Sequence, residues 1–165
     1  MDDDWLTRGM RGLVRRCVAE AVRRGSATVE AEHVLLALTA DPAGDLGVVL
    51  LEAGLPHGAL MAALRQERLL SLATAGVTPI DAQDLTATPR TRKPTWGASV
   101  VAARARAHRS PTHGLRRRLP EIDVLVGILR ADIGTVPRAL AIVGVDRPAL
   151  VARLEQMQAR TSNTG

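Results

Sequence analysis

The sequence predicts an all-α protein, and three observations support this fold class. The 165 residues include no Phe, no Tyr and only two Trp, so the core must be aliphatic, which favours packed helices over aromatic-rich strands. Apolar residues recur at helical spacing along most of the chain. Prolines and glycines fall between the periodic segments, where they begin or end helices. The chain is therefore expected to fold as one helical domain.

An internal repeat organises the sequence. A shift of 90 residues aligns 34–64 with 124–154 without a gap, and many paired positions are identical. The identical pairs that we use are Val34 and Val124, Leu35 and Leu125, Gly44 and Gly134, Leu50 and Leu140, Gly54 and Gly144, Leu60 and Leu150, and Leu64 and Leu154. Shared glycines and shared apolar spacing predict a shared backbone in two tandem units.

Each unit is predicted to contain four helices. The apolar positions from Met10 to Ala21 predict the first helix, which Gly25 ends. Thr28 is the predicted cap of the second helix, and Glu30 and Glu32 suit its positive amino-terminal end. The expected helices of the first unit are about 7–24, Thr28 to about 40, a short one ending at Gly54, and one reaching 66 or beyond; those of the second are near 94–109, 120–132, 135–143 and 146–159.

The domain boundaries follow from these helices. Residues 1–165 are expected to form a single domain, with repeat one over about 6–69 and repeat two over about 94–159. Residues 70–93 are rich in Thr, Ala and Pro and lack sustained periodicity, so they are expected to form a linker. The tail at 160–165 is expected to be disordered.

Composition excludes several kinds of site. Lys93, the only lysine, lies between Arg92 and Pro94, so the chain has no phosphate-binding Gly-Lys-Ser/Thr loop. A single cysteine, Cys17, excludes an intramolecular disulfide and favours a cytoplasmic location. The sequence shows no signal peptide and no transmembrane run. It also shows no catalytic motif, so we expect no enzyme activity, no cofactor and no metal site.

The segments "AEHVLLALTAD" at 31–41 and "VLLEAGLPHGAL" at 49–60 carry a family resemblance. They resemble the Clp amino-terminal (Clp N, or Clp R) repeat, in which a Thr-Glu-His-Leu-Leu-Leu-type helix precedes a Leu-x-x-x-Gly-Val junction. The second unit is similar, with "EIDVLVGILRAD" and "ALAIVGVDRPAL". The resemblance implies two tandem four-helix repeats packed as one pseudo-twofold domain, of the ClpC-like type but without ATPase modules.

The resemblance also implies a function in protein recognition. Clp N domains receive substrates and adaptors for Clp unfoldases, so the chain is expected to act as an adaptor, decoy or regulator of ATP-dependent proteolysis. Some ClpC-type domains recognise phosphorylated arginine through the glutamate of the Glu-His pair, which corresponds to Glu32 here. The second repeat has Ile122 at that position, with Glu121 next to it, and Ala31 replaces the usual threonine. Glu32 could instead serve only as a favourable first-turn acid.

Two alternative functions remain open from the sequence. ClpC-type domains also bind cyclic peptide antibiotics near amino-terminal phenylalanines; Leu6 occupies one such position, beside Trp5, and both are candidate partner-binding residues. A second alternative is an arginine-rich nucleic-acid binder, with basic clusters in 8–15 and 116–118. The chain lacks aromatic stacking platforms, which argues against binding of single-stranded nucleic acid. Trp5 and Trp96 could each anchor a partner or hold the start of a helix.

Overall fold

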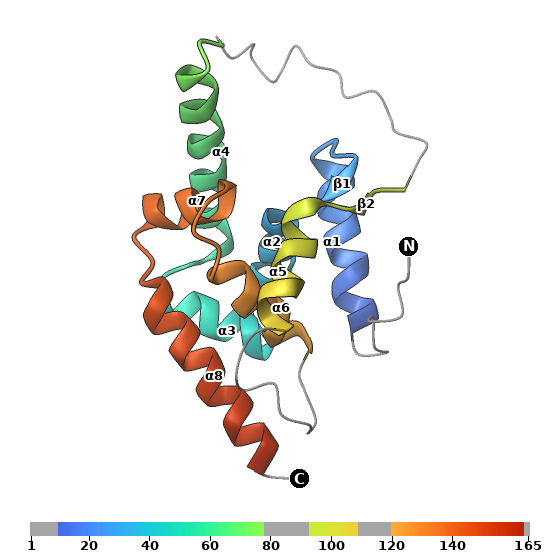
Figure 1. The fold of residues 1–165 in the computed structure, drawn as a ribbon, viewed down its shortest axis with the longest axis vertical. Helices are drawn as coiled ribbons and strands as arrows, with labels where there is room; N and C mark the ends of the chain where they lie inside the picture. Colours follow the sequence, from blue (N-terminus) through green and yellow to red (C-terminus); the bar gives the residue numbers. More distant parts are fainter. Residues whose placement is uncertain (1–9, 78–92, 109–119, 164–165) are drawn as a thin grey trace.

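The computed structural model describes residues 10–77, 93–108 and 120–163, which form eight helices and one pair of short strands (Figure 1). The prediction of a mostly helical protein is confirmed. The helices are α1 (Arg11–Arg23), α2 (Ala31–Thr39), α3 (Asp45–Glu52), α4 (His57–Thr74), α5 (Ala98–His108), α6 (Pro120–Leu129), α7 (Thr135–Val143) and α8 (Arg147–Asn163). The strands are β1 (Thr28–Val29) and β2 (Thr95–Trp96).

Helices α2 and α6 form the centre of the core. Leu35 of α2 and Leu125 of α6 are fully buried, and most other residues of both helices are buried as well. A helix that is apolar on all sides is stable in water only when neighbouring elements bury its surface. Here α1 packs on α2, α5 packs on α6, and α8 packs on the other side of α6, while α4 packs on α7 (Figure 1). A single aliphatic core therefore spans both halves of the chain.

The helix bounds follow the 90-residue repeat of the sequence. Helices α3 and α4 begin at Asp45 and His57, and α7 and α8 begin at Thr135 and Arg147. Gly54 and Gly144, which follow α3 and α7, have φ angles of 78° and 83°. This left-handed conformation ends helices and favours glycine, so the shared glycines have a shared backbone role. The pseudo-twofold arrangement of two Clp N repeats remains a prediction.

The structure differs from the prediction at the starts of two helices, where the two short strands lie. Residues 94–97 do not begin a helix, because β2 pairs in parallel with β1, with Thr95 opposite Thr28. Thr28 does not cap α2; Glu30 occupies that position, and its backbone N–H donates to Nδ1 of His33 at 2.9 Å. The Glu30 carboxylate accepts hydrogen bonds from the backbone N–H and the hydroxyl of Ser99 at 3.1 and 2.5 Å. Glu30 therefore joins α2 to the start of α5.

Two helices extend beyond their predicted ends. Helix α4 continues to Thr74, into the segment expected to be a linker, because Glu67 and Ser71 are fixed by contacts that include α7. Helix α8 continues to Asn163, so the expectation of disorder from residue 160 is wrong for 160–163. Local periodicity does not reveal the contacts of Glu67 with α7, which hold the later turns of α4. Residues 1–9 and most of the expected linker lie outside the described residues.

Two glycines allow a close approach of backbone segments. A Cβ atom on Gly127 of α6 would lie 2.0 Å from the carbonyl oxygen of Ala103 in α5. A Cβ atom on Gly47 of α3 would lie 1.9 Å from the carbonyl oxygen of Asp41. Neither separation is sterically possible, so both positions require glycine in this arrangement. The 90-residue shift aligns Gly127 with Ala37 of α2, which is fully buried, so the core accommodates a methyl group at this position of the first repeat.

Among the described residues, no single helix is long and apolar enough to cross a membrane; α3 and α4 reach that length and composition only together, with a bend of 67° between them.

Candidate functional site

Glu32 lies in a cleft of about 310 Å³ between α1, α2, α4 and the start of α7. We call this the first cleft. The first turn of α2 places Glu32 there, and the end of α1 with its following turn forms the opposite wall. The lining residues are Arg24, Gly25, Ser26, Glu32, His33, Leu64, Glu67, Arg68 and Thr135.

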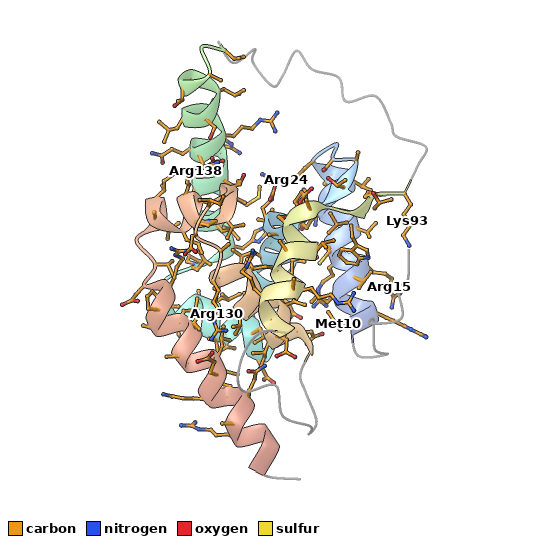
Figure 2. All side chains as sticks on the ribbon, in the orientation of Figure 1. Met10, Arg15, Arg24, Lys93, Arg130 and Arg138 are labelled. Carbon is orange, nitrogen blue, oxygen red and sulfur yellow. The ribbon has the colours of Figure 1, made fainter. Side chains whose placement is uncertain are left out.

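The two carboxylates of the first cleft have different environments. Glu67 is buried, and its Oε1 atom accepts hydrogen bonds from Arg138 at 2.7 Å and from Ser71 at 2.6 Å. Figure 2 shows Arg138 where α7 meets α4. Burial raises the pKa of Glu32, and the carboxylates of Glu30 and Glu67 add to the increase, while its own backbone N–H and the charge of Arg24 oppose it. Glu32 is therefore a half-buried acid near Arg24, whereas Glu67 forms an ion pair with Arg138.

Positive charge and a neutral imidazole complete the first cleft. Arg24, directly after α1, and Arg68 of α4 line it, and Arg24 is labelled in Figure 2. Burial lowers the pKa of His33 to about 4, with Arg24 adding to the effect and Glu30 opposing it. His33 is therefore neutral at physiological pH and positions Glu30, as expected for a capping residue. A ligand that fits these groups presents a guanidinium to the carboxylates and an anion to the arginines.

Glu121 lies in a different cleft, of about 120 Å³, which we call the second cleft. Its lining residues are Arg16, Leu38, Asp41, Gly44, Asp45, Leu46, Gly47, Glu121, Ile122 and Met157. Burial raises the pKa of Glu121, and Arg16 opposes the increase. The structure therefore does not bring the predicted residues Glu32 and Glu121 together.

The 90-residue repeat relates three positions of the two clefts. It places Ile122 at the position of Glu32, Met157 at that of Glu67, and Thr135 of the first cleft at the position of Asp45 in the second. Both carboxylates of the first cleft are thus replaced by apolar side chains in the second. The sequence repeat contained this signal, but Glu67 and Met157 were not predicted as site residues because the gap-free alignment stopped before them.

The other residues singled out in the sequence lie away from the two clefts or outside the described residues. Trp5 and Leu6 lie outside the described residues. Trp96 is half-buried against the core, which agrees with the interpretation that it holds the start of the second unit. Cys17 is buried in α1, and burial raises its thiol pKa to about 12, as expected for an unreactive core residue. Within the described ranges, no group of three or more His, Cys, Asp or Glu side chains could hold a metal ion.

Comparison of the sequence with models of known protein families gives no match, and no curated protein matches it significantly.

Proposed function

We propose that the chain is a protein-recognition domain of a Clp proteolysis system, which binds arginine-bearing segments of its partners in the first cleft. The partners are a Clp unfoldase, its adaptors or its substrates in the cytoplasm, and the proposal assigns binding and no catalysis. The observation behind it is the half-buried Glu32 carboxylate, which faces a cleft containing a second carboxylate and two arginines.

The charges of the first cleft support an arginine ligand. A guanidinium placed between Glu32 and Glu67 would form charge-assisted hydrogen bonds, which are about twice as strong as neutral ones. It would also relieve the cost of keeping the Glu32 carboxylate ionised in a desolvated position. A phosphoryl group on the same arginine could then contact Arg24 and Arg68.

Other features support a domain of this family. The chain has eight helices in its described part, and the starts of α3, α4, α7 and α8 repeat at the spacing of the sequence. The Glu-His pair of the family resemblance is Glu32 and His33, and both line the first cleft. Arg24 and Arg68 are exposed at the same cleft, where a partner could contact them.

The test is fluorescence anisotropy with labelled peptides that carry phosphoarginine, arginine or citrulline at one position. We expect the phosphoarginine peptide to bind most tightly. Glu32→Gln should weaken its affinity by about tenfold or more, because the free energy of a hydrogen bond to a charged group corresponds to about this factor. Glu121→Gln is the matched control, because it removes a carboxylate from the second cleft. Equal affinity for wild type and Glu32→Gln would reject the first cleft as the site.

A pull-down from lysate identifies the partner class. Wild type at moderate salt is expected to enrich Clp subunits, adaptors or arginine-modified proteins, and Glu32→Ala is expected to lose them. Recovery that is sensitive to nuclease and to salt would instead favour nucleic-acid binding, because phosphate contacts weaken steeply as salt increases.

A further inference from the structure

The second cleft opens into a groove between α3 and α8. The groove has a volume of about 380 Å³ and shares Asp45 and Met157 with the second cleft. Figure 1 shows α3 beside α8, and the ion pair of Glu52 with Arg153 joins the two helices. Val48 and Val49 form the apolar side of the groove, and Val48 is 39% exposed. Arg153, Gln156 and Arg160 also line the groove, so the second cleft is the deep end of a longer surface that carries apolar and cationic side chains.

The floor of the second cleft fits one aliphatic side chain. Leu38, Leu46 and Ile122 contribute apolar atoms there and are buried beneath the surface. A cavity of 150 Å³ lined by aliphatic and aromatic residues is known to bind benzene, and the second cleft has about 120 Å³. Ile122 and Met157 replace the two carboxylates of the first cleft, so a buried guanidinium would find no acceptor on this floor.

The rim of the second cleft is acidic. Among the residues that the structure describes, Asp41, Asp45 and Glu121 line it together with one cation, Arg16. Arg16 lies 3.7 Å from Asp41 and also acts on Glu121, so it offsets part of the charge of both carboxylates. Asp45 is exposed, and three carboxylates to one cation leave an excess of negative charge beside the apolar floor. A ligand complementary to this arrangement has an aliphatic side chain next to a positive charge.

We propose that the second cleft and the α3–α8 groove bind a peptide that inserts a leucine-like side chain beside a lysine or other cationic group. The aliphatic side chain occupies the floor at Ile122, and the cation lies between Asp45 and Glu121. The remainder of the peptide follows the groove past Val48 and Val49. This inference extends the proposed function, because it adds a second peptide site of different specificity to the same domain.

The test uses labelled Gly/Ser peptides that contain Leu-Lys, Ser-Lys or Leu-Gln at the centre, titrated with the full chain. The Leu-Lys peptide is expected to bind. The Ser-Lys peptide is expected to bind about tenfold more weakly, because the free energy of burying one leucine side chain corresponds to about this factor. The surface double variant Asp45→Asn/Glu121→Gln should weaken binding of the Leu-Lys peptide several-fold, mainly by lowering its association rate, and should reduce the dependence of binding on salt. Met157→Ala tests the apolar wall without adding charge to the core.

The variants separate this inference from the proposed function. Glu32→Gln should leave binding of the Leu-Lys peptide unchanged, while it weakens the phosphoarginine peptide. If the Leu-Lys peptide does not bind, or binds equally to wild type and to both second-cleft variants, the inference is overturned whatever the first cleft does. If instead Glu32→Gln alone weakens it, the first cleft is a general peptide site and the second cleft has no role.

Discussion

The two halves of the molecule have the same order of helices but different side chains at corresponding positions. The cleft at the start of α2 contains Glu32 and Glu67, whereas the cleft at the start of α6, which residues of the first half also line, contains Ile122 and Met157. Helix α4 packs closely on α7, whereas α3 and α8 leave a groove between them. Corresponding positions of the sequence repeat thus give one cleft two carboxylates and the other cleft two apolar side chains. The following predictions test this comparison, beginning with the largest effect.

The largest effect is expected where α5 meets α6. Gly127→Ala should reduce the free energy of unfolding by about 3 kcal/mol, because its Cβ would overlap the Ala103 carbonyl group. Ala37→Gly at the corresponding position of α2 should cost only about 1 to 2 kcal/mol, through backbone entropy and a lost methyl group. Urea denaturation of both variants measures the difference. Equal losses would mean that the two helix contacts are equally close.

The second prediction compares the ion pairs that join the halves. Arg138→Ala should cost about 1 to 3 kcal/mol, because it leaves the buried Glu67 carboxylate with fewer partners. Arg153→Ala, which removes the exposed pair with Glu52, should cost less than about 1 kcal/mol. Thermal denaturation at low and high salt distinguishes them, since salt screens only the exposed pair strongly. A larger loss in Arg153→Ala would contradict the difference between the two interfaces.

The third prediction concerns Glu30, which joins the first half to the second. Burial alone would raise its pKa, but hydrogen bonds from Ser99 and Thr28 and the proximity of His33 lower it below its ordinary value. A lowered pKa stabilises the fold above the ordinary pKa of about 4.3, and this stabilisation is lost as pH falls through the folded-state pKa. Glu30→Gln should therefore cost about 1 to 2 kcal/mol at neutral pH and much less in acid.

Chemical denaturation of wild type and Glu30→Gln between neutral and acid pH measures this dependence. The two stabilities should converge as pH falls. Parallel curves over the whole range would show that the Glu30 charge does not stabilise the start of α5.

The smallest effect on stability is expected for a substitution of Glu32, and this substitution should stabilise the fold, whereas the previous ones destabilise it. Because burial raises its pKa, ionisation of Glu32 destabilises the fold at pH values above its ordinary pKa. Glu32→Gln should therefore raise the melting temperature slightly at neutral pH and leave it unchanged in strong acid. The same variant should lose affinity for arginine peptides, which is the pattern of a binding residue that costs stability. A lower melting temperature at neutral pH would indicate that Glu32 stabilises its helix.

The sequence alone determined the aliphatic core, the positions of most helices and the 90-residue repeat. These follow from local chemistry: apolar spacing places α2, α3 and α7, and Gly54 and Gly144 end helices because they adopt positive φ. Cys17, on the apolar face from Met10 to Ala21 that predicted the first helix, is buried in the structure.

The tertiary structure decided the features that depend on contacts between segments far apart in the sequence. The pairing of β1 with β2 converts a predicted helix start into a strand, and the contact of Glu67 with Arg138 of α7 holds α4 where it continues into the expected linker. The first cleft depends on Glu67, whose position beside α7 no local pattern indicates. The physical reason is that helix propensity acts over a few residues, whereas a cleft is formed by side chains from elements far apart in the chain.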